Sequence, residues 1–119
     1  MWLLTGQFVD EPYRYVYNTF TVDETTPAIN FVSSPSGTVL HIELGYGNAE
    51  MDGKIYQLKN IHDPARNGTV TVRLDPNAAG AYLSLNNGFQ TQFNISTNGC
   101  VKLLFTWYNG NQGRWMVMQ

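Results

Sequence analysis

The side chains able to do acid–base or nucleophilic chemistry are few in this 119-residue chain. His41 falls within a run of alternating apolar residues, and His62 stands beside Asp63 in a loop that contains proline. A hydrolase that uses a His–Asp pair also needs a nucleophile on an ordered turn, and the chain has no Gly-x-Ser-x-Gly motif. The serines of the loop at residues 33–37 are explained by turn formation. We therefore expect that the protein is not an enzyme.

The acidic residues are scattered and show no metal-ligand spacing. The stretch Glu50-Met-Asp52 is too sparse for an EF-hand loop, so a solvated turn is the simpler interpretation. Two carboxylates brought together in space could still serve a glycosidase, which sequence spacing does not exclude. Cys100 is the single cysteine, which excludes an intrachain disulfide and a cysteine-based zinc site and favours a buried free thiol. We expect no cofactor and no metal.

The composition favours a protein with extensive contacts to other subunits. Charged residues make up 13% of the chain, about half of the usual share of roughly 25%. Neutral polar groups cost less to desolvate than ions, so such a surface suits burial against protein. The net charge is −2 with no basic cluster, which argues against nucleic acid as a partner.

No apolar run approaches the ~18 residues that a membrane span needs, so we expect no membrane partner. The apolar start at residues 1–4 is too short for the core of a signal peptide, which has roughly 7–15 residues. We expect a complete, unsecreted chain.

Short runs with alternating apolar residues predict β-strands along most of the chain. Upstream, strands are expected at residues 13–22, 29–32 and 38–44, the last with Leu40, Ile42 and Leu44 on one face. Downstream, they are expected at residues 54–59, 69–74, 81–85, 90–95, 100–107 and 114–118. The turn marks between them are Asp52-Gly53, Asn67-Gly68, Asn87-Gly88, Asn98-Gly99 and Asn109-Gly110. These dipeptides suit type I′ turns, because both central residues of such a turn need positive φ.

The predicted fold class is all-β. About eight strands are too many for one open sheet of this size, so we expect an antiparallel β-sandwich of jelly-roll type or a small barrel. Residues 13–119 are expected to form a single domain, and residues 1–12 an N-terminal arm. The arm holds Trp2, Leu3, Leu4 and Phe8. Because an isolated apolar arm would lower solubility, it is expected to pack on its own domain or on a neighbouring subunit.

Aromatic residues are the remaining candidates for contact with a partner. Stacking on sugars is open to Tyr46, Tyr82, Phe89, Trp107, Tyr108 and Trp115. The alternative for Trp107 and Trp115 is packing in the core across a hairpin around residues 109–111. Tyr46 and Phe89 lie beside turn glycines and are the better candidates for an exposed contact.

Four segments of the second half follow one another in a distinctive order of strands and turns: Gly53–Asn60, Gly68–Arg73, Ala81–Leu85 and Gly113–Val117. This arrangement, over a little more than half of the chain, resembles structural proteins of tailed bacteriophages. The resemblance implies a non-enzymatic β domain of a tail fibre, a tail spike or a capsid decoration protein, often assembled as a trimer.

The short chain without an upstream shaft favours a capsid decoration (cement) protein over a fibre tip. The resemblance then implies a homotrimer in the virion, assembled in the host cytoplasm, that binds capsid protein at subunit junctions. The arm residues Trp2, Leu3, Leu4 and Phe8 would make the capsid or neighbour contact.

The alternative is a receptor-binding module of a tail fibre or spike that recognises host surface glycan, with Tyr46, Phe89 and Tyr108 as candidate contacts. A cellular β-sandwich hydrolase or carbohydrate-binding domain is a third hypothesis. It is weakened by the absence of a nucleophile motif and of a secretion signal.

Overall fold

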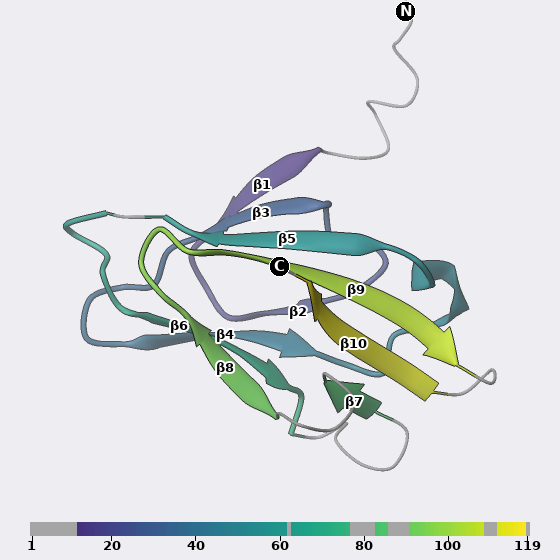
Figure 1. Ribbon diagram of the computed structural model, residues 1–119. Helices are drawn as coiled ribbons and strands as arrows, with labels where there is room; N and C mark the ends of the chain where they lie inside the picture. Colours follow the sequence, from purple (N-terminus) through teal and green to yellow (C-terminus); the bar gives the residue numbers. More distant parts are fainter. Residues whose placement is uncertain (1–11, 62, 77–82, 86–90, 109–111, 119) are drawn as a thin grey trace, which may run out of the picture.

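The computed structural model describes residues 12–61, 63–76, 83–85, 91–108 and 112–118 (Figure 1). The predicted arm, with Trp2, Leu3, Leu4 and Phe8, lies outside the described residues apart from Pro12, and so does Phe89.

Ten strands in the described part of the chain form two sheets that face each other (Figure 1). Sheet A has the order β1 (Tyr13–Val16), β3 (Ile29–Val32), β5 (Ile55–Asn60), β9 (Cys100–Tyr108), β10 (Gln112–Met118) and β7 (Leu83–Leu85). Sheet B has the order β2 (Phe20–Val22), β4 (Val39–Leu44), β6 (Thr69–Leu74) and β8 (Gln92–Ile95). A short 3-10 turn, η2 (Ala49–Met51), connects β4 to β5. The all-β prediction is confirmed.

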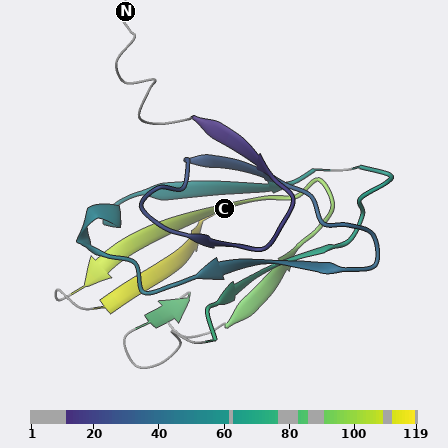
Figure 2. The ribbon, with the colours of Figure 1, turned by 180° about the vertical axis from the view of Figure 1, so that it is seen from behind.

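The first six strands alternate between the two sheets. β1, β3 and β5 pair in parallel in sheet A, and β2, β4 and β6 pair in parallel in sheet B. The chain therefore winds as a flattened coil whose successive turns stack on one another (Figure 2). At the last turn, β9 pairs antiparallel with β5, and β8 pairs antiparallel with β6.

The predicted antiparallel pairing is wrong, because both sheets are mixed. The alternation of side chains has the same two-residue period in parallel and antiparallel strands, so it carries no information on strand direction. The prediction of about eight strands is also too low. Residues 13–22 form two strands, β1 and β2, that lie in opposite sheets.

The turn marks that the structure describes are not type I′ turns. At Asp52-Gly53 only Gly53 has positive φ (84°), while Asp52 has φ −56° and ψ 126°. The Lys54 amide donates to the Met51 carbonyl at 3.0 Å, and together these values define a type II turn. At Asn98-Gly99 it is Asn98 that has positive φ (65°).

Position 68 requires glycine because a side chain has no room there, and not because of its backbone conformation. A Cβ on Gly68 would lie 2.1 Å from the Pro35 carbonyl oxygen. Its dipeptide Asn67-Gly68 stands between β5 and β6, which belong to different sheets, so it does not close a hairpin.

The core lies between the inner faces of the two sheets. Trp115 is fully buried and contacts Phe105 edge-on at a centroid distance of 4.8 Å, with Tyr56 at 5.9 Å. The prediction that Trp115 packs in the core is confirmed, as is the buried face of β4, Leu40, Ile42 and Leu44. Trp107 is half-buried and packs on the core, stacked with Phe105.

Candidate functional site

The outer face of sheet A carries the candidate site. Alternate residues of its strands point away from the core. The apolar members of this face are Tyr13, Tyr15, Ile29, Phe31, Ile55, Leu104, Met116 and Met118. The polar members are Gln57, Lys59, Cys100, Lys102, Thr106 and Arg114.

Three aromatic rings gather on this face at the edge formed by β1 and β3. Tyr15 stacks on Phe31 at 5.1 Å, and Tyr13 meets both rings edge-on, at 6.3 Å and 6.1 Å. Tyr13 and Tyr15 remain 50% and 55% exposed. The register of the parallel pair places Tyr13 beside Ile29 and Tyr15 beside Phe31, which brings the rings together from two turns of the coil.

The outer face of sheet B is different in character. Arg73 and Glu43 form an ion pair across β6 and β4 at 2.9 Å, and Thr71 donates to the Asn94 amide oxygen at 2.7 Å. His41 lies half-buried on this face, whereas His62 lies outside the described residues. Two pairs of polar side chains thus bond to each other on sheet B, while sheet A presents apolar groups to solvent.

The charged side chains in the strands of sheet A are all basic. The six strands contain no aspartate or glutamate, and the outer face carries Lys59, Lys102 and Arg114. The Lys59 ammonium donates to the Asn98 carbonyl at 2.9 Å, and Lys102 is exposed. The outer face is therefore apolar and basic, although the chain has a net charge of −2.

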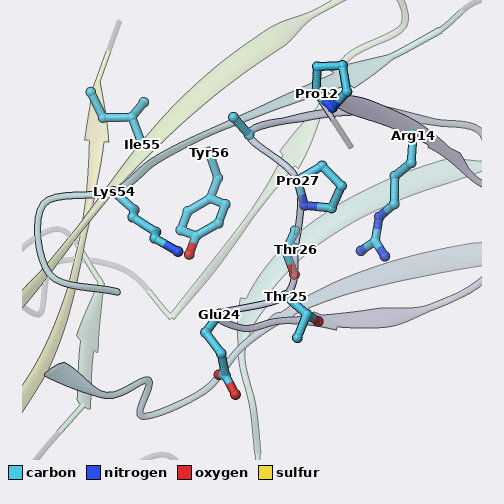
Figure 3. Close-up of a pocket in the computed structure, with 10 residues that line it drawn as sticks. Pro12, Arg14, Glu24, Thr25, Thr26, Pro27, Lys54, Ile55 and Tyr56 are labelled. Atoms are coloured by element: carbon cyan, nitrogen blue, oxygen red, sulfur yellow. The ribbon is translucent and has the colours of Figure 1, made fainter. Parts of the chain in front are cut away.

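A groove of about 610 Å³ opens beside this face, at the start of β1, β3 and β5 (Figure 3). It is lined by Pro12, Arg14, Glu24, Thr25, Thr26, Pro27, Ala28, Lys54, Ile55 and Tyr56. Arg14 lies toward one end and Lys54 toward the other in Figure 3, with Tyr56 beside Lys54. Ile55 belongs both to the groove and to the outer face of sheet A, so the two surfaces are continuous.

Two groups at the groove have shifted pKa values. Partial burial raises the pKa of Asp23, but hydrogen bonds from the Thr25 hydroxyl and amide and from Thr26, together with the charge of Arg14, outweigh it and lower the pKa. Burial raises the pKa of Tyr56 to about 12, with smaller contributions from the negative charges of Asp23 and Glu24. The Tyr56 hydroxyl donates to the Asp23 carbonyl at 3.3 Å.

Of the candidate glycan contacts Tyr46, Phe89 and Tyr108, the structure describes the side chain of Tyr46 alone, which is 43% exposed. Its loop is held closely, because the Trp115 indole donates to the Gly45 carbonyl at 2.9 Å. The Tyr46 carbonyl approaches Gly113 so closely that a Cβ there would lie 2.2 Å away. Tyr46 projects from a tightly held loop and is not part of the outer face of sheet A. The side chain of Tyr108 lies outside the described residues.

The prediction of a buried Cys100 is wrong, because its thiol is exposed. β9 begins at Cys100 with its side chain on the outer face, and the neighbouring Val101 packs on the core instead.

Among the residues that the structure describes, no group of three or more His, Cys, Asp or Glu could hold a metal ion. In the same residues, no helix is long and apolar enough to cross a membrane.

The sequence analysis did not single out Tyr13, Tyr15 and Phe31 as a surface. The alternation of tyrosines at residues 13, 15 and 17 was the available signal, together with the absence of acidic residues in the strands around them.

Comparison with protein-family models, with curated proteins and with solved structures found no match.

Proposed function

We propose that this protein is a non-enzymatic structural protein of a bacteriophage virion, which decorates the capsid and binds neighbouring subunits through the outer face of sheet A. The observation that carries the proposal is the contrast between the two outer faces. Sheet A exposes Tyr13 and Tyr15 with apolar neighbours, whereas sheet B carries the Arg73–Glu43 ion pair and the Thr71–Asn94 hydrogen bond. Exposed contiguous apolar surface of this kind marks sites of protein association. The bacteriophage assignment is supported by the resemblance of the strand and turn segments.

The geometry of the rings favours a protein partner over a polysaccharide on this face. Tyr13 stands at 88° to Tyr15 and at 69° to Phe31, so the rings form no common plane on which sugar rings could stack. An uneven aromatic surface suits the side chains of another subunit, where Tyr and Trp contribute much of the binding energy.

Capsid stabilisation would follow from mass action. A protein that binds the assembled shell and not free subunits lowers the free energy of the shell. The apolar face contributes roughly 25 cal/mol for each Å² removed from water.

The test is binding to capsids from which accessory proteins have been stripped, measured by co-sedimentation. The wild-type protein should bind, and the Tyr13→Ala/Tyr15→Ala double variant should bind at least tenfold more weakly. Val39→Ala is the matched control, because Val39 is 49% exposed on the opposite face. A wild-type protein that does not bind capsids, or a double variant that binds equally well, would overturn the proposal.

A second candidate function is recognition of host glycan by a tail-fibre or spike module. The exposed Tyr46 on its tightly held loop favours it, since a fixed aromatic ring with a polar hydroxyl can stack on a sugar. Screening against host surface glycans tests it. Binding that is lost in Tyr46→Ala would support this function over decoration, and an absence of binding across the panel would remove it.

A further inference from the structure

We propose that the outer face of sheet A binds the N-terminal segment, residues 1–11, of a second copy of this chain. This inference rests on the proposed function. It names the segment of a neighbouring subunit that binds to the same surface.

The segment and the face complement each other in composition. The segment contributes the apolar side chains Trp2, Leu3, Leu4, Phe8 and Val9. It also carries Asp10 and Glu11 and has no lysine or arginine. The face is apolar and carries Lys59, Lys102 and Arg114, with no acidic residue in any of its strands. Apolar groups can therefore meet apolar groups while the charges have opposite sign.

The segment is long enough to cross the face. One row of paired residues runs from Tyr13 through Ile29, Gln57 and Lys102 to Met118. Five neighbouring strands span about 19 Å at the usual strand spacing. Eleven extended residues reach up to about 36 Å, which covers both the aromatic edge and the basic centre.

Chain geometry favours a second copy over the segment's own sheet. On its own sheet the segment is tethered to β1 through Pro12, which limits how far its last residues can lie from Tyr13. Asp10 is three residues before Tyr13, which limits its Cα to about 10 Å from that of Tyr13. Lys102 lies three strand spacings from Tyr13, about 14 Å. On its own copy the Cα of Asp10 therefore falls about 4 Å short of the Cα of Lys102, whereas the segment of a second copy is free of this limit.

Association through the strand edges is less favourable. β1 is the edge strand of sheet A, and its Arg14 points inward, where its guanidinium lies over the Phe20 ring at 4.7 Å. An inward-pointing charge on an edge strand is a known protection against edge-to-edge pairing.

A contact between a segment and a face joins two different surfaces, and such contacts form a ring when the rotation between copies closes and a filament when it does not. The expected product is a closed homo-oligomer, with the trimer implied by the resemblance at about three times the 13.4 kDa chain mass.

The experiment measures the mass of the full chain by light scattering over a range of concentrations. Lys102→Glu and Tyr15→Ala should each raise the dissociation constant at least tenfold. The matched controls are Lys54→Glu, which makes the same charge change in the groove, and Val39→Ala, which truncates an exposed residue on sheet B. Both controls should associate as the wild type does.

Charge reversal supplies the sharper test. Glu11→Lys should weaken association, and the combination of Lys102→Glu with Glu11→Lys should restore at least part of it. Mixing the two single variants should restore part of the association, since each retains the partner that the other has lost, although a trimer keeps one contact between like variants.

Other outcomes would overturn the inference. A wild-type protein that is monomeric at all concentrations would do so, as would an oligomer that is insensitive to Lys102→Glu and Tyr15→Ala. A monomer in which Lys102→Glu accelerates proteolysis within residues 1–11 would assign the face to the chain's own segment. An oligomer that does not bind capsids would support this inference and contradict the proposed function. A monomer that binds capsids would contradict this inference and support the proposed function.

Discussion

The guanidinium of Arg14 lies over the ring of Phe20, with 4.7 Å between its central carbon and the ring centroid. Arg14 belongs to β1 and Phe20 to β2, the edge strands of sheets A and B, so this contact joins the two sheets at the first turn of the coil. The Arg14 Nε also donates to the Asn30 side-chain oxygen at 3.0 Å. The Arg14 guanidinium, held by the Phe20 ring and the Asn30 side chain, thus covers the core at this end of the coil.

Replacing Arg14 should loosen this end of the coil. Arg14→Ala should lower the free energy of unfolding by about 1–2 kcal/mol, because it removes both the cation–π contact and the hydrogen bond to Asn30. Urea denaturation measures the change. Arg14→Lys retains the charge without the planar guanidinium and should recover only part of the loss. Equal denaturation midpoints for wild type and Arg14→Ala would show that the contact adds nothing.

Trp115 should be among the most sensitive positions of the core. Trp115→Phe removes the indole N–H that donates to the Gly45 carbonyl and leaves unfilled space beside Phe105. We expect a loss of about 2–4 kcal/mol in the free energy of unfolding. Trp107→Phe is the comparison, because Trp107 is half-buried, and its loss should be clearly smaller in the same urea titration. Similar losses at both positions would contradict this ranking.

Gly113 should not tolerate a side chain. The Cβ of Gly113→Ala would lie 2.2 Å from the Tyr46 carbonyl oxygen, which is backbone and cannot rotate away. We expect a loss of roughly 1–3 kcal/mol from the forced shift of the loop, read from thermal unfolding by circular dichroism. Gly45→Ala is the control, because its Cβ would meet only the Thr21 methyl group at 3.9 Å. A melting temperature for Gly113→Ala equal to that of the wild type would rule out the close approach.

Alkaline pH should destabilise the protein through Tyr56. The pKa of Tyr56 is raised to about 12 in the folded chain, while an unfolded tyrosine ionises near 10.0. The unfolded state therefore releases its proton first, and the contribution of Tyr56 to stability is present below pH 10 and is lost as the pH rises toward 12. Denaturation midpoints measured across this range should fall with pH.

The variant Tyr56→Phe isolates this effect. It has no ionisable group and should show a smaller fall in stability over the same pH range than the wild type. Tyr15→Phe, which alters an exposed ring, should keep the wild-type slope. Identical slopes for wild type and Tyr56→Phe would show that the titration of Tyr56 is not coupled to folding.

The sequence by itself determined where most of the strands form and which of their side chains face inward. Leu40, Ile42 and Leu44 alternate with polar residues, and that period alone predicts a buried face, which the structure confirms. The burial of Trp115 was also within reach of the sequence. Such features depend on neighbouring residues of one strand, and the two-residue period expresses them directly.

Only the tertiary structure decided which strands pair and in which direction. Strands pair through backbone groups that are the same in every residue, so β1 gives no local sign that its partner is the parallel β3. Tyr15 and Phe31 are sixteen positions apart and become one surface only because the coil stacks its turns in that register. The apolar face of sheet A follows from that stacking, which no single strand encodes.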